Sequence, residues 1–342
     1  MLNQILGDYI TVIKVAVIGT VFVDCKGFAR ESYNAAGRNL GSIQFIHGGV
    51  GRNVAENMAN LGIPTTFLSS VDRTGLGKEV IEKLIQTGVD TQYILEQDQT
   101  GMGMWMAILD EKGDLAGSIS QMPSLDELEA FLAHHGNALS QDVTHIILEI
   151  DLNATITKSV IDLARTRNIP VYGIPGNLSV ILAHREVLAD VDCFVCNEIE
   201  VSRLLDVPFH TLELTQMYKR LEYFVCESGL ASMVVTLGSK GAVYFDRLQG
   251  ISGYQPVFPV EVVDSSGAGD AFFSGTIAGL ISGEPLAQAV QYGSRIAAWT
   301  IQCTENTCSN LMAKMHTDKL FDDYLVWQRE IGRGKSSGKK VS

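Results

Sequence analysis

Apolar residues recur along most of this chain in short runs, with helical stretches between them. Val54, Met58 and Leu61 follow each other at helical spacing, and Gly62 ends that stretch. This repeated alternation of strand and helix predicts a mainly parallel sheet covered by helices on both faces. The runs typical of buried strands lie at residues 14–19, 65–71, 144–150, 169–174, 191–196, 232–237 and 241–246.

Two segments depart from this rhythm. Residues 20–47 are dotted with glycine and alternate in character, and residues 100–121 alternate about a polar turn at 110–114. Met102, Met104 and Met106 share one face of the second segment. Ordinary burial accounts for such a stripe, and a small sheet laid over a site must also bury one face. We expect both segments to form a separate small sheet.

Composition limits the class of protein. A chain of 342 residues with 46% apolar residues can build one large α/β domain or a domain with an appendage. The net charge of −13 and the lack of a basic stripe argue against a nucleic-acid partner. No apolar stretch reaches membrane-spanning length without a charge or glycine, so we expect no membrane partner.

Cysteine usage and the two ends of the chain give further expectations. Six cysteines without paired spacing, and no secretory signal, indicate a cytoplasmic protein. Cys193 and Cys196 form a lone C-x-x-C inside an apolar run, which favours core packing over a metal or redox role. We expect a short leader at 1–13, a helix at 316–332 and a disordered basic tail at 333–342.

One short run carries candidate chemistry. Residues 264–270 read Asp-Ser-Ser-Gly-Ala-Gly-Asp, between a β-rich stretch at 257–263 and a helix-like stretch at 271–281. The glycines leave room for backbone N–H groups to close on an anion, and a helix N-terminus favours negative charge. Asp270 then stands where it can accept a proton from an attacking hydroxyl, as phosphoryl transfer requires. Taken alone, the run also suits a tight strand-to-helix connection with an acidic N-cap.

A second run makes the combination specific. Residues 48–62 read Gly-Gly-Val-Gly-Arg-Asn-Val-Ala-Glu-Asn-Met-Ala-Asn-Leu-Gly. With 264–270, they resemble the two signature regions of the PfkB (ribokinase-like) family of sugar and nucleoside kinases. The resemblance covers roughly residues 14–310. It implies a kinase domain over 14–315, folded as a three-layer α/β/α sandwich with a mainly parallel sheet and a small β-sheet lid from about 20–47 and 100–121.

The resemblance implies roles for phosphoryl transfer. Asp270 would be the base, and Gly267, Ala268 and Gly269 would form the anion hole for ATP. Asn197 and Glu200, an Asn-x-x-Glu motif, would hold Mg²⁺, although the same spacing also suits a helix N-cap with a capping box. The nucleotide side would be lined by Asn197, Thr236, Gly238 and Gly241.

It also implies roles for the acceptor substrate and a second cation. Either Glu149 or Asp151 would add a hydroxyl ligand after the strand at 144–150. Asp264 and Ser266 would hold a monovalent cation such as K⁺. The positions matching those that grip sugar hydroxyls in the family are Asp24, Gly48, Gly49 and Asn53.

Short matches favour one branch of the family. Arg52 before Asn53, residues 151–153 and residues 297–307 resemble pseudouridine kinases, so we expect ATP-dependent phosphorylation of pseudouridine to its 5′-phosphate. Arg52 would donate to a uracil carbonyl, or it would pair with Glu56 four residues on. A ribokinase- or fructokinase-like sugar kinase, and a regulator that binds a nucleoside or sugar without turning it over, are the alternatives.

One departure and one surface complete the expectations. Ile174 stands where members of the family commonly carry Asp before a proline, which predicts altered Mg²⁺ binding or slow turnover. The small sheet has a second face with apolar residues such as Trp105, so a homodimer through the lid is also expected.

Overall fold

Nine strands form the central sheet of the computed structural model, which describes residues 13–332. They are β1 (Val15–Ile18), β4 (Thr65–Asp72), β5 (Ile94–Gln97), β8 (His145–Glu149), β9 (Val171–Ile174), β10 (Cys193–Asn197), β11 (Ser232–Thr236), β12 (Ala242–Asp246) and β13 (Ile251–Gln255). Their order is β13-β12-β11-β10-β9-β8-β1-β4-β5, and only β12 and β13 run antiparallel to their neighbours. The mainly parallel sheet is confirmed.

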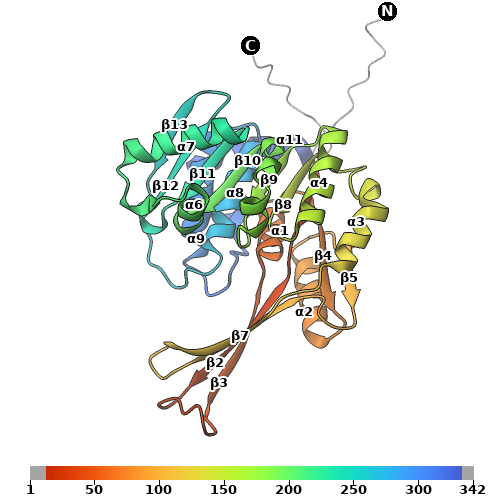
Figure 1. Cartoon of the computed structure of the whole chain (residues 1–342), viewed down its shortest axis with the longest axis vertical. Coiled ribbons are helices and arrows are strands. Elements are labelled where there is room, and N and C mark those ends of the chain that lie inside the picture. The colour runs from red at the N-terminus through yellow and green to blue at the C-terminus, as the bar shows by residue number, and fades with distance from the viewer. Residues whose placement is uncertain (1–12, 333–342) are drawn as a thin grey trace, which may run out of the picture.

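Helices cover both faces of this sheet (Figure 1). One face is covered by α1 (Val50–Asn60), α2 (Gly75–Gln86), α8 (Ala268–Ile281), α9 (Leu286–Thr300), α10 (Leu311–Met315) and α11 (Asp322–Gly332). The other is covered by α3 (Asp126–Leu139), α4 (Ala154–Arg167), α5 (Ser179–Ala183), α6 (Glu198–Leu205) and α7 (Leu214–Ser228).

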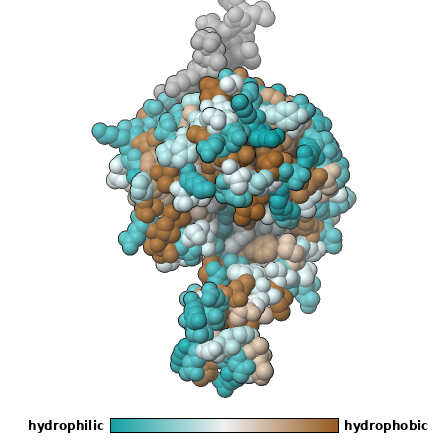
Figure 2. Space-filling view, turned by 60° about the vertical axis from the view of Figure 1, so that its left-hand side comes forward, coloured by the Kyte–Doolittle hydropathy of each residue, from teal (hydrophilic) through white to brown (hydrophobic). Residues whose placement is uncertain are grey.

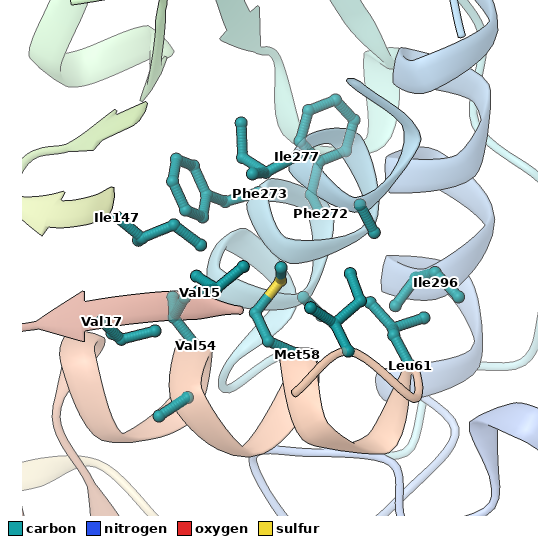
Figure 3. Close-up of a cluster of buried hydrophobic side chains, with 14 of the residues drawn as sticks. Val15, Val17, Val54, Met58, Leu61, Ile147, Phe272, Phe273, Ile277 and Ile296 are labelled. Atoms are coloured by element: carbon teal, nitrogen blue, oxygen red, sulfur yellow. The ribbon is translucent and has the colours of Figure 1, made fainter. Parts of the chain in front are cut away.

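Each face has its own apolar core, because successive strand residues point to opposite sides. Val15 and Val17 belong to one core, whereas Ala16 and Ile18 belong to the other. Figure 3 shows Met58 of α1 in one cluster with Val15 of β1 and Phe273 of α8. Helices α1 and α8 therefore pack side by side, which fixes the two motif segments relative to each other.

Four strands form a separate small sheet, the lid, which projects from the body (Figures 1 and 2). They are β2 (Phe22–Ala29), β3 (Gly41–Gly48), β6 (Gly103–Leu109) and β7 (Leu115–Gln121), in the order β3-β2-β6-β7. Both segments expected to leave the sheet-and-helix rhythm are thus confirmed as strands. The methionine stripe is not evenly buried, since Met102 lies in the body core while Met106 is exposed.

The register of the lid separates its residues into two faces. Asp24 pairs with Ile46 on one side and Trp105 on the other, so these three side chains share a face. On the opposite face Cys25 pairs with Phe45 and Met106, and Met106 pairs with Ile119. The exposed row of that face, formed by Phe45, Met106 and Ile119, is called the outer row below.

Two expectations about elements need correction. Residues 257–263 are irregular rather than a strand, because Pro256 and Pro259 offer no N–H donors and the N–H of Val263 bonds to the carbonyl of Ile301. The last helix begins at Asp322, not at 316, after Asp318 caps a short 3₁₀ turn at 319–321. The proposed tail at 333–342, and all but residue 13 of the leader, lie outside the described residues.

Two further expectations concern the pair Cys193 and Cys196 and the membrane. Cys193 and Cys196 are buried in opposite cores, as an i, i+3 pair in a strand must be, so they pack as apolar residues. Within residues 13–332, no helix combines the length and the apolar character needed to span a bilayer.

Candidate active site

Four neighbouring parallel strands end in residues that the sequence singles out. Glu149, Ile174, Asn197 and Thr236 are the last residues of β8, β9, β10 and β11. The register pairs Glu149 with Ile174 and Asn197 with Thr236, so they lie along one edge of the sheet. Ligands of open α/β sheets bind beyond this carboxyl edge.

The N-terminus of α8 points a candidate base toward this edge. Gly267 caps the helix in a left-handed conformation (φ 74°), and a Cβ there would lie 2.0 Å from the carbonyl oxygen of Asn306. Only glycine fits so close an approach. Ala268 and Gly269 follow in the first turn, although the N–H of Ala268 makes a long bond, 3.3 Å, to the Ser265 carbonyl.

Asp270 links the two motif segments. Nδ2 of Asn53, in α1, donates a hydrogen bond of 2.8 Å to Oδ2 of Asp270. Burial raises the pKa of Asp270 to about 7, and the charges of Glu149 and Glu200 add to the rise while the Asn53 bond opposes it. The side chain is still partly exposed. A carboxylate with this pKa suits a general base at neutral pH.

Glu149 joins three elements around the site. Its Oε2 accepts hydrogen bonds from the N–H of Thr20 (2.8 Å), the hydroxyl of Thr20 (3.0 Å) and the N–H of Gly51 (3.3 Å). A Cβ on Gly51 would lie 2.5 Å from the Cα of Gly19, so two glycines let the end of β1 touch the start of α1. Glu149 therefore holds the segment after β1 and the start of α1 together through hydrogen bonds from Thr20 and Gly51. No sequence pattern marks Thr20, because its partner lies 129 residues away.

Arg52 is buried and faces protein groups. Its side chain is 3% exposed and forms an ion pair with Glu56, which is 0% exposed. Nη1 donates to the carbonyl of His47 (2.9 Å) and to Oδ1 of Asn53 (2.8 Å). Of the two roles that the sequence allowed, the structure contains the pairing with Glu56.

The loop after α9 closes over the same region. Oγ1 of Thr307 donates to Glu56 at 2.7 Å, and Nδ2 of Asn306 donates to the carbonyl of His47 at 3.1 Å. His47 precedes Gly48, the last residue of β3. This loop therefore ties the root of the lid to α1. The resemblance to pseudouridine kinases singled out residues 297–307, but no pattern in their sequence predicted these contacts.

Asn197 and Glu200 form a complete capping box at the start of α6. Oδ1 of Asn197 accepts the N–H groups of Ile199 and Glu200, both at 2.9 Å, and Oε2 of Glu200 accepts the N–H of Asn197 at 2.7 Å. Burial raises the pKa of Glu200. In the described part of the chain, no three His, Cys, Asp or Glu side chains converge closely enough to hold a metal on their own.

The lid brings its carboxylate to the root of the sheet. Asp24 is half-buried, and burial raises its pKa against the opposing charge of Lys26. A Cβ on Gly48 would lie 3.8 Å from both Oδ2 of Asp24 and Nδ2 of Asn306. Gly49 caps α1 immediately after. Asp24, Gly48 and Gly49 are therefore together, beside Asn53.

Two further loops carry residues that the sequence singles out. The N–H of Ser266 donates to Oδ1 of Asp264 at 2.8 Å, and this bond and the Ser266 side chain lower the pKa of Asp264. Beyond β11, the N–H of Leu237 bonds to the carbonyl of Gly241 at 2.7 Å, which closes a tight loop containing Gly238.

Comparison with known proteins agrees with this arrangement. Residues 12–311 match the model of the pfkB family carbohydrate kinases. The chain is 36% identical over 293 residues to a guanosine-inosine kinase from Exiguobacterium acetylicum, covering 86% of this chain and 96% of that protein. It is 27% identical over 290 residues to a pseudouridine kinase from Escherichia coli (strain K12), covering 84% and 90%. The Arabidopsis thaliana ribokinase complexed with ribose and ATP superposes with a TM-score of 0.74 at 21% identity, over 88% of this chain and 98% of that one.

Proposed function

The chain belongs to the pfkB family of ATP-dependent carbohydrate and nucleoside kinases, and from that premise we propose that it phosphorylates the 5′-hydroxyl of a nucleoside. The observation that carries the proposal is the hydrogen bond between Asn53 and Asp270, because it unites the substrate-side and phosphate-side motifs in one site. A ribokinase-like sugar kinase and a non-catalytic binding protein are the competing functions.

The residues around Asp270 divide the work of phosphoryl transfer. Oδ2 of Asp270, oriented by Asn53, accepts the proton of the attacking hydroxyl. The first N–H groups of α8, at Gly267, Ala268 and Gly269, face the transferring phosphoryl oxygens, where a helix N-terminus stabilises negative charge. Asp24 and the Gly48–Gly49 backbone hold the sugar hydroxyls so that the reacting one meets Asp270.

Cations are part of the proposal. A carboxylate offers about four lone-pair positions, so the capping box still leaves Glu200 able to hold a metal-bound water beside Asn197. The chemistry that Mg²⁺ supplies when bound is neutralisation of the phosphate charge. Asp264, whose lowered pKa keeps it anionic, would hold a monovalent cation with Ser266. Thr236, Gly238 and Gly241 line the nucleotide side.

Two observations bear on which nucleoside is the acceptor. The guanosine-inosine kinase relative is more similar to this chain than the pseudouridine kinase relative, over a comparable length. Arg52, whose position favoured a uracil contact, is occupied by Glu56 and backbone groups. Both observations favour a purine nucleoside such as guanosine or inosine, with pseudouridine as the second candidate.

Trp105 is positioned to distinguish a nucleoside from a bare sugar. Its strand register places it next to Asp24 on the same lid face, with Ile46 on the other side of Asp24. A base attached to a sugar held by Asp24 would then meet an aromatic and an aliphatic side chain. Stacking of a base on an aromatic residue contributes about 1–3 kcal/mol.

We predict that Trp105→Ala lowers kcat/KM for nucleosides by about 10-fold or more and changes the value for ribose little. The measurement is ADP release by purified protein with guanosine, inosine, pseudouridine, uridine, adenosine, ribose and fructose. Tyr223→Ala, which removes an exposed aromatic from α7, is the matched control. Equal wild-type kcat/KM for ribose and for every nucleoside would refute the nucleoside assignment, and no turnover with any acceptor would favour the binding protein.

A homodimer through the lid is still proposed, but from the outer row and not from the face of Trp105, because Trp105 shares its face with Asp24. Phe45, Met106 and Ile119 are 54%, 42% and 65% exposed and lie in one row across the four strands, with Cys25 between Phe45 and Met106. Such a contiguous apolar row suits a two-fold contact in which both copies present the same face. We predict a dimeric mass at micromolar concentration that Phe45→Glu converts to monomer. A wild-type protein that is monomeric throughout that range would refute the contact.

A further inference from the structure

Asp151 carries a buried carboxylate oxygen that the protein leaves without a partner. The residue follows β8 by two positions and is 5% exposed. Its Oδ1 accepts the N–H of Val180 at 3.0 Å and that of Ile181 at 3.5 Å. Its Oδ2 is buried and has no hydrogen-bond partner among residues 13–332. Because an unsatisfied buried carboxylate oxygen is costly, this atom calls for a ligand from outside the chain.

The surroundings of Asp151 favour a positive ligand. Asp151 lies two residues beyond the end of β8, at the same carboxyl edge of the sheet at which β10 ends in Asn197 and at which α6, the helix that carries Glu200, begins. Hydrogen bonds from Thr20 and Gly51 satisfy Glu149. Asp151 and Glu200 are therefore the groups that a cation would still find available there.

The neighbouring strand end lacks the carboxylate that the family resemblance leads one to expect. Ile174 ends β9, pairs with Glu149 and is buried among apolar side chains. Val180, the backbone partner of Asp151, lies six residues after Ile174 in the segment leading from β9. Asp151 thus reaches from the end of β8 into the region that follows Ile174.

We propose that Asp151 holds Mg²⁺ through a metal-bound water, together with Asn197 and Glu200, and replaces the carboxylate missing at Ile174. The inference rests on the proposed kinase function. The Val180 N–H holds one oxygen of Asp151, which leaves the other able to accept a hydrogen bond from that water. Such outer partners position a metal without touching it, and their loss typically costs about 10–100-fold in metal affinity. Asp151 is accordingly a positioning residue.

The test measures binding of Mn²⁺, as a probe for Mg²⁺, to full-length protein saturated with ADP, by electron paramagnetic resonance of the free ion. Asp151→Asn keeps an acceptor for Val180 but removes the charge, and we expect about 10-fold or more weaker Mn²⁺ binding. Affinity for ADP without metal should stay the same. Asp192→Asn is the matched control, because Asp192 also accepts a backbone N–H, that of Val171, at the opposite end of β9.

A second variant tests the exchange of roles. Ile174→Asp, introduced into the Asp151→Asn protein, should restore part of the Mn²⁺ affinity if the two positions serve one ion. Wild-type Mn²⁺ affinity in Asp151→Asn overturns the proposal, and a failure of Ile174→Asp to restore binding overturns the replacement. A wild-type protein that binds no Mn²⁺ with ADP overturns the metal site and the proposed kinase function together. Unchanged binding in Asp151→Asn leaves the kinase function standing.

Discussion

The Asp270→Asn variant is expected to keep the wild-type fold and to lose about 10²–10⁴-fold in kcat. The amide has nearly the same shape, and its oxygen can still accept the bond from Asn53. It cannot take the proton of the acceptor hydroxyl. Single-turnover rates with the best acceptor in the ADP-release screen measure the loss. A variant that retains more than about a tenth of the wild-type rate would show that Asp270 is not the base.

The pH dependence of activity and of stability is a second test of Asp270. Because burial raises the pKa of Asp270 to about 7, wild-type kcat/KM should rise with pH through that value, as the base loses its proton. The raised pKa stabilises the folded state at low pH, and this contribution is lost as pH rises through about 7. Asp270→Asn should lack that part of the pH dependence of stability. Asp246→Asn, at the end of β12, where the side chain accepts the N–H of Leu248 in the following turn, should match the wild type in both measurements.

Arg52→Ala should destabilise the protein by about 3–5 kcal/mol, because it leaves the carboxylate of Glu56 buried without its partner. Both side chains are almost completely buried. Without Arg52, the side chain of Thr307 is the only one within residues 13–332 that donates to Glu56. The measurement is the free energy of unfolding from urea denaturation. Arg73→Ala, which breaks the exposed pair with Asp98, should cost less than about 1 kcal/mol.

A double variant separates the ion pair from a direct substrate contact. Arg52→Met with Glu56→Gln removes both charges and should recover much of the stability that Arg52→Ala loses. If Arg52 instead contacts the base, Arg52→Ala would leave the free energy of unfolding within about 1 kcal/mol of wild type and abolish the preference for nucleosides over ribose. That pattern would contradict the structural role.

Much of the fold follows from local sequence, because buried parallel strands are continuous apolar runs. The run ending at Glu149 is an example, and it lies where the pattern predicts. Strands β5 and β13 escaped prediction because they are short and half-exposed, and β13 contains Gly253. The stretch at 257–263 has strand-like composition, but Pro259 lacks an N–H donor and the N–H of Val263 bonds to the carbonyl of Ile301 instead of to a strand.

The site divides in the same way. The motifs gave Asp270 and Asn53, and the structure places them in contact. The choice between Glu149 and Asp151 could not be made from sequence, since two carboxylates two residues apart are distinguished only by the backbone groups that they meet. The link from Thr307 to Glu56 spans 251 residues and carries no periodic pattern. Such contacts depend on tertiary packing.

The lid has a consequence for how this protein could change its acceptor over evolution. The residues proposed to contact phosphate lie in the body. The side chains proposed to contact the nucleobase belong to two chain inserts, residues 22–48 and 103–121. Grafting both inserts from a relative would exchange acceptor range while leaving Asp270 and the helix cap untouched. Both inserts would have to be exchanged at once, because the parallel pairing of β2 with β6 places Trp105 next to Asp24. The lid is thus a structural unit whose exchange would change which acceptor the protein selects.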